Sequence, residues 1–188
     1  MKQKQERILN IPNILTLARI IITPFIVYAI LEGKPAFALL LMGVAGITDM
    51  LDGAIARMFN QRSTVGAFMD PLADKLMLIS TIVALYFLAH IPTYLFLAVV
   101  FRDMVIVLGA TAYEMVTHKL EMTPLFTSKI TTFLQIMLVL CVLANMAWQT
   151  PGAMILQTVV WLTFAFTCIS GIQYMVLWMR KAVHAENR

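Results

Sequence analysis

The sequence predicts an all-α integral membrane protein with six transmembrane helices, a short interfacial helix at the N-terminus, and both termini in the cytoplasm. Of its 188 residues, 61% are hydrophobic and 13% are charged, and the mean hydropathy is +0.84. A soluble domain carries about 25% charged residues. The chain also contains apolar runs that can each supply the roughly 20 helical residues needed to cross a bilayer. Finally, the basic residues between these runs fall mostly on one side of the expected membrane.

Each apolar run ends at polar or helix-breaking residues. The expected spans cover about 13–31, 35–59, 65–89, 91–116, 124–147 and 151–179. The breaks between them contain Gly33 and Pro35, the polar stretch 60–64, Pro92, the stretch 117–124, and Pro151 with Gly152. The charged start of the chain favours an interfacial helix that leads into the first span. No repeat or second domain interrupts this order, so we expect a single domain over residues 1–188.

The orientation follows from the lysines and arginines in the short connections. With a cytoplasmic N-terminus, the outer connections hold only Lys34. The inner segments then hold Lys2, Lys4, Arg7, Arg57, Arg62, Lys119, Arg180, Lys181 and Arg188. This asymmetry predicts both termini in the cytoplasm. We expect the membrane to be a bacterial-type inner membrane. Cys141 and Cys168 lie inside apolar runs, so we expect no structural disulfide.

Four aspartates lie where the second span ends and the third begins. Asp49 and Asp52 are three residues apart, and Asp70 and Asp74 are four apart, so each pair shares a helix face. The short connection makes the two spans antiparallel neighbours. At about 1.5 Å per residue, both pairs lie roughly 10 Å from that connection and are level with each other. Intramembrane charges are costly and should face a wet cavity, so we expect a polar cavity open to the cytoplasm.

The aspartates predict a site for hard cations. No His or Cys lies nearby, and carboxylate oxygens suit Mg²⁺ or Mn²⁺. Two divalent ions would balance four carboxylates and could clamp a diphosphate. Beside the acids, Gly53, Ala56 and Gly66 leave room for a large group, and Arg57 can bind phosphate oxygens through its planar fork. A cation-coupled transporter is an alternative, but it predicts broken helices or internal symmetry, and the sequence has neither. A non-catalytic membrane scaffold is a third possibility.

The stretch 49–74 can be read as Asp49-x2-Asp52-Gly53-x2-Ala56-Arg57-x8-Gly66-x3-Asp70-x3-Asp74. At every position it resembles the signature of the CDP-alcohol phosphatidyltransferase family. The resemblance implies a homodimer with two divalent metals, which transfers a substituted phosphate from a CDP-linked donor to an alcohol and releases CMP. It further implies that Asp49, Asp52 and Asp70 hold the metals. Asp74 would complete the second metal site and act as general base. Gly53, Ala56, Arg57 and Gly66 would receive the CMP half of the donor.

The alcohol acceptor is read from other stretches. NIPNILTLARIIITPF (10–25), VGAFMDPLADK (65–75) and SGIQY (170–174) look like phosphatidylglycerophosphate synthases, which implies CDP-diacylglycerol as donor and glycerol 3-phosphate as acceptor. Arg102-Asp103 departs from their usual Arg-Glu, and TSKITTFLQI (127–136) looks like the CMP-forming cardiolipin synthases, whose acceptor is phosphatidylglycerol. We expect glycerol 3-phosphate, with phosphatidylglycerol as the alternative, and no nucleic-acid partner.

Basic residues outside the signature are candidates for binding substrate phosphate. These are Arg102, Lys129, Arg19 and Lys75. Two of them have structural alternatives. Lys129 could extend its chain to the membrane interface. Arg102 could pair with Asp103 or with one of the four signature aspartates.

Overall fold

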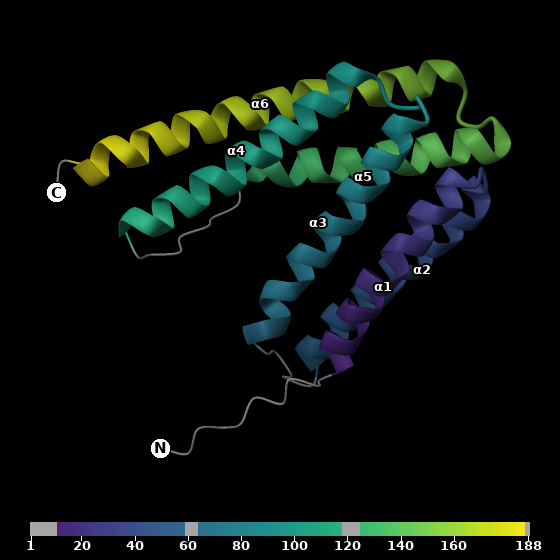
Figure 1. Cartoon of the computed structure of the whole chain (residues 1–188), viewed down its shortest axis with the longest axis horizontal. Helices are drawn as coiled ribbons and strands as arrows, with labels where there is room; N and C mark the ends of the chain where they lie inside the picture. The colour runs from purple at the N-terminus through teal and green to yellow at the C-terminus, as the bar shows by residue number, and fades with distance from the viewer. Residues whose placement is uncertain (1–10, 59–63, 118–124, 187–188) are drawn as a thin grey trace. The chain divides into compact units, whose positions relative to one another are not determined.

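The computed structural model describes residues 11–58, 64–117 and 125–186, with side chains over 14–49, 69–70, 72–112 and 125–180. Over these ranges it has six α-helices and no strand, which confirms the predicted all-α class (Figure 1). The helices are α1 (Ile11–Leu31), α2 (Pro35–Met58), α3 (Thr64–Phe87), α4 (Thr93–Thr117), α5 (Phe126–Trp148) and α6 (Ala153–Glu186). The expected interfacial helix at the N-terminus lies outside the described residues.

Within the part of the chain that the structure describes, four helices are long and apolar enough to cross a membrane. Their apolar windows are Ile14–Leu31, Thr93–Ala112, Phe126–Trp148 and Ala153–Arg180. In α2 a further apolar stretch covers Pro35–Asp49. Large apolar side chains stay exposed on the helices, as at Phe87 (76%) and Met154 (85%). Long apolar helices with exposed apolar faces indicate an integral membrane protein. The count of six spans and the placement of the termini stay predictions.

The last helix is longer than the sequence analysis expected. We predicted a span ending near residue 179, whereas α6 continues to Glu186 and contains 34 residues. The added segment is rich in helix-forming Arg, Lys, Ala and Glu, and it contains no Gly or Pro that would end a helix. At about 1.5 Å per residue α6 is about 50 Å long, longer than the roughly 30 Å core of a bilayer.

The chain's contacts divide it into two compact units, and the first consists of Met1–Leu88 with Leu143–Thr150. In this unit α1 packs against both α2 and α3 (Figure 1). A tight turn joins α1 to α2. The N–H of Lys34 donates to the carbonyl of Ala29 (2.9 Å), and that of Gly33 donates to the carbonyl of Ile30 (3.1 Å). Gly33 has φ of 68°, a left-handed conformation that favours glycine at a helix end.

The buried faces of α1 and α2 change from apolar to polar along their length. On α1 the buried side chains Ile26 and Ile30 continue the same stripe as Thr16, Arg19 and Thr23. These positions recur every three or four residues, so they share one face. On α2 the buried residues Ala38, Met42 and Ala45 lead at the same spacing to Asp49. The polar ends of both stripes supply the site described below.

The second unit consists of Ala89–Val142 with Pro151–Arg188. In it α4 packs against α6, and the indole of Trp178 lies directly against Gly109, where a Cβ would collide with it. Near the start of α4, Tyr94 stacks on Trp161 with ring centroids 5.6 Å apart. Two threonine hydroxyls join α5 to α6, from Thr131 to the carbonyl of Phe166 (3.1 Å) and from Thr163 to that of Leu134 (3.4 Å). The expectation of one domain over 1–188 stays a prediction.

Candidate functional site

Three of the predicted aspartates meet the polar end of α1. Nη2 of Arg19 lies 2.6 Å from Oδ1 of Asp49, and Nη1 pairs with Oδ1 of Asp74. One turn earlier, the hydroxyl of Thr16 donates to Oδ1 of Asp70. Helix α1 therefore provides a hydrogen-bond donor to one aspartate of α2 and two of α3. We call Thr16, Arg19, Asp49, Asp70 and Asp74 the aspartate cluster.

The cluster is buried on its basic side and open on its acidic side. Arg19 is 1% exposed and Thr16 is fully buried, whereas the side chains of Asp49 and Asp74 are 44% and 51% exposed. A buried guanidinium is tolerated when carboxylates balance its charge. The half-exposed carboxylates remain accessible to a ligand that approaches from the side opposite α1.

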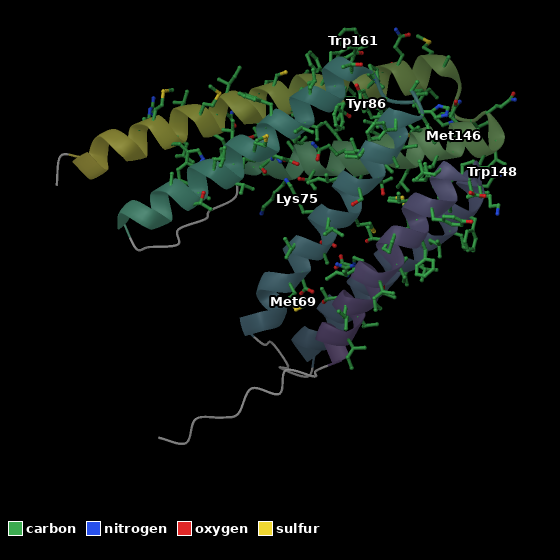
Figure 2. The ribbon with its side chains drawn as sticks, in the orientation of Figure 1. Met69, Lys75, Tyr86, Met146, Trp148 and Trp161 are labelled. Carbon is green, nitrogen blue, oxygen red and sulfur yellow. The ribbon has the colours of Figure 1, made fainter. Side chains whose placement is uncertain are left out.

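Several predicted site residues lie on the same helices. Asp52, Gly53, Ala56 and Arg57 are in α2 and Gly66 is in α3, but their side chains fall outside the described part of the chain. Helical spacing puts Asp52 on the face of α2 that carries Asp49. Lys75, next to Asp74 on α3, is half-buried (Figure 2).

The cluster was tested as a cation site by its donor chemistry. Among the described residues, no three His, Cys, Asp or Glu side chains converge tightly enough to hold one ion, and Asp49 and Asp74 converge on the Arg19 guanidinium instead. The donor type nevertheless fits a hard divalent cation, since the accessible groups are carboxylate oxygens. The predicted pair of metal ions and the ligand roles of these aspartates stay predictions.

A second polar cluster surrounds Arg102 in the other unit. Arg102 is 2% exposed, and each guanidinium nitrogen has an oxygen partner. Nη1 lies 2.7 Å from Oδ1 of Asp103, Nη2 donates to the hydroxyl of Ser128, and Nε donates to that of Ser170 over 3.3 Å. The guanidinium also lies 5.9 Å from the ring centre of Tyr174. Helices α4, α5 and α6 thus each provide a partner for this arginine.

Arg102 and its partners Asp103, Ser128 and Ser170, which we call the Arg102 cluster, include a residue that was predicted to bind the acceptor phosphate. The alternative in which Arg102 pairs with Asp103 is present in the structure, while a phosphate-binding role for Arg102 stays a prediction. Lys129, next to Ser128, is exposed. The sequence analysis missed Ser128 and Ser170. The sequence could have indicated Ser170, because Thr163, Thr167 and Ser170 recur at helical spacing in an otherwise apolar stretch. In the structure all three are fully buried.

Comparison with known proteins identifies the family of this chain. The profile of the CDP-alcohol phosphatidyltransferase family matches residues 9–169. The chain is 34% identical to a probable CMP-forming cardiolipin synthase of Drosophila melanogaster, over 94% of the chain and 60% of that protein. It is 32% identical to the CMP-forming cardiolipin synthase of Homo sapiens, over 93% of the chain and 63% of that protein.

A third relative is matched over most of both sequences. The CDP-diacylglycerol–glycerol-3-phosphate 3-phosphatidyltransferase of Blochmanniella floridana is 32% identical over 88% of the chain and 90% of that protein. The chain thus spans 60% and 63% of the length of the two cardiolipin synthases, but nearly the whole of this shorter relative. The family profile and these identities lead to one conclusion: the chain belongs to the CDP-alcohol phosphatidyltransferase family.

Proposed function

We propose that this chain transfers the phosphatidyl group of CDP-diacylglycerol to a glycerol-type alcohol and releases CMP, a step of phospholipid biosynthesis. In this reaction the acceptor hydroxyl attacks the phosphorus that carries the diacylglycerol, and the bond from that phosphorus to CMP breaks. The observation that carries the proposal is the aspartate cluster, in which α1 gathers Asp49, Asp70 and Asp74 with accessible carboxylates. Membership of the family supports the same chemistry.

The proposed roles follow the signature. Asp49, Asp52 and Asp70 hold two divalent ions, Mg²⁺ or Mn²⁺, and Asp74 completes the second site. When bound, such ions neutralise diphosphate oxygens in the transition state. Asp74 takes the proton from the acceptor hydroxyl. Gly53, Ala56, Arg57 and Gly66 receive the CMP half of the donor, with Lys75 close to its phosphates.

We further propose that the enzyme is a homodimer in a bacterial-type inner membrane, with its active site facing the cytoplasm. The basic residues of the expected inner connections support this orientation. The lipid donor keeps its acyl chains in the bilayer while its diphosphate reaches the aspartates, so the site needs a lateral opening between helices.

For the acceptor we propose phosphatidylglycerol. Glycerol 3-phosphate carries about two negative charges near pH 7, like other phosphomonoesters, and needs basic groups that can leave their present partners. The Arg102 guanidinium is buried and engaged by Asp103, Ser128 and Ser170, which fits better with an acceptor of lower charge. The names of two relatives that are each matched over more than nine-tenths of this chain support the same acceptor. The product would be cardiolipin.

Glycerol 3-phosphate is the second candidate. The sequence analysis favoured it, and the name of the Blochmanniella relative, matched over 90% of its length, supports it. The exposed Lys129 is then the basic residue best able to reach its phosphate.

The test supplies purified protein in detergent with CDP-diacylglycerol, Mn²⁺ and each acceptor separately, then measures CMP and the mass of the lipid product. We expect cardiolipin from phosphatidylglycerol, and no CMP after chelation of the metal. Product from glycerol 3-phosphate alone would reverse the choice of acceptor. Absence of CMP with both acceptors, together with cation flux in liposomes, would overturn the enzyme proposal in favour of a transporter.

A further inference from the structure

We infer that Arg19 is a built-in counter-cation of the aspartate cluster: it positions Asp49 and Asp74 and competes with divalent ions for their oxygens. The inference rests on the proposed metal-dependent function, and it assigns Arg19 a role different from binding substrate phosphate. Arg19 touches the aspartates rather than the reacting atoms, so it is a positioning residue.

The side chain of Arg19 connects α1 to both α2 and α3. Its two terminal nitrogens reach different carboxylates, Nη2 to Asp49 on α2 and Nη1 to Asp74 on α3. A planar guanidinium can serve two carboxylates at once in a fixed geometry, which a lysine ammonium cannot reproduce. Arg19 thus keeps Asp49 of α2 and Asp74 of α3 near each other. No direct contact between the two carboxylates is needed for this.

The Arg19 side chain lies on the buried side of the aspartate cluster. It is 1% exposed, and one turn further along the same buried stripe the hydroxyl of Thr23 donates to the Arg19 carbonyl over 2.9 Å. Its carboxylate partners, in contrast, are about half exposed. A divalent ion would therefore approach Asp49 and Asp74 from their open side while the guanidinium stays on the buried side.

This arrangement makes the cation site weaker than its carboxylates alone would be. A divalent ion bound to Asp49 or Asp74 would lie within a few ångströms of a fixed positive charge, and the repulsion is strong where water is partly excluded. A diphosphate offsets that repulsion with its own negative charge. We therefore expect the divalent ion to bind tightly only when the CDP-linked donor is also bound. In this way Arg19 couples metal binding to substrate binding.

The experiment measures Mn²⁺ affinity of the purified full-length protein in detergent, from the electron paramagnetic resonance signal of free Mn²⁺. Arg19→Gln removes the charge, and we expect it to bind Mn²⁺ at least about tenfold more tightly than the unchanged protein. Its Tm in the presence of chelator should be lower, because Asp49 and Asp74 lose their counter-charge. Arg19→Lys keeps the charge and should stay within about threefold of the unchanged affinity. Addition of CDP should tighten Mn²⁺ binding more in the unchanged protein than in Arg19→Gln.

Arg102→Gln is the matched control. It also removes a buried arginine with a carboxylate partner, so its Tm should fall, but its Mn²⁺ affinity should not change. Equal or weaker Mn²⁺ binding by Arg19→Gln would overturn the inference. If that variant does not fold, tenfold tighter binding by Arg19→Lys would overturn it instead, since the charge is retained. Metal-dependent CMP release by the unchanged protein tests the proposed function separately, so either idea can fail while the other stands.

Discussion

Arg19 and Arg102 are both almost fully buried, yet their carboxylate partners differ in exposure. The side chains of Asp49 and Asp74, which pair with Arg19, are 44% and 51% exposed, whereas that of Asp103, which pairs with Arg102, is 10% exposed. A buried ion pair closed on all sides is costly to open. The Arg19 pairs can therefore exchange partners with a ligand, while the Arg102 pair is better suited to joining helices.

At the residue scale, the sharpest prediction concerns Asp74. Asp74→Asn removes the proposed base while it keeps the size of the side chain, and loss of a general base lowers kcat by about 100-fold or more. CMP release from CDP-diacylglycerol at saturating substrate measures the effect. Glu32→Gln is the control, because Glu32 is an exposed carboxylate in the α1–α2 turn. An Asp74→Asn enzyme with the same kcat as this control would contradict the assignment.

Thr16 tests whether the contact between α1 and Asp70 supports the same site. Thr16→Val keeps the shape of the side chain but removes the hydroxyl that donates to Asp70. Groups that orient metal-binding side chains typically change affinity or activity by about 10- to 100-fold, so we expect about tenfold lower kcat/KM and weaker Mn²⁺ activation. Thr16→Ser keeps the hydroxyl and should retain most activity. The idea fails if the two variants behave alike.

At the scale of helices, the sequence predicted what depends on nearby residues. Each expected span overlaps one helix, because apolar length, Gly33, Pro92 and Pro151 are all visible along the chain. The i, i+3 and i, i+4 aspartate pairs were visible for the same reason. The partners of Arg102 were not, because Ser128 and Ser170 come from two other helices. Nor did the sequence identify Arg19 as the partner of Asp49 and Asp74, because such pairing depends on how α1 packs.

Packing of α4 on α6 gives a prediction at this scale. A Cβ at Gly109 would collide with the indole of Trp178, so Gly109→Ala should force the two helices apart. Overpacking of this kind costs about 1–3 kcal/mol. Gly46→Ala is the control, since Gly46 lies in α2 with open space around it, where alanine stabilises a helix by about 0.5–1 kcal/mol. Thermal unfolding in detergent, followed by circular dichroism, should give a lower Tm for Gly109→Ala. Equal Tm values for both variants would show that this contact does not limit stability.

At the scale of the whole molecule, hydropathy and charge describe different parts of the chain. The signature at 49–74 occupies the charged ends of α2 and α3, whereas the remainder of both helices is apolar. A site that must bind a diphosphate cannot be as apolar as the lipid around it. In α2 and α3 the charged residues accordingly lie at one end of each helix, and the apolar residues lie at the other end.

The number of membrane spans, six or four, depends on whether α2 and α3 cross the membrane. If α2 and α3 both cross, the connection at residues 59–63, outside the described part of the chain, lies in the cytoplasm with the proposed site. If neither crosses, that connection stays on the outer side with the α1–α2 turn.

In a background in which Cys141 and Cys168 are replaced by serine, single cysteines at positions 32, 61 and 180 distinguish the two cases. An impermeant maleimide applied to intact cells should label Glu32→Cys, and should label Gln61→Cys and Arg180→Cys only after permeabilisation. Labelling of Gln61→Cys in intact cells would put the aspartates on the outer side, away from a donor delivered on the cytoplasmic side, and the proposed orientation would then be wrong.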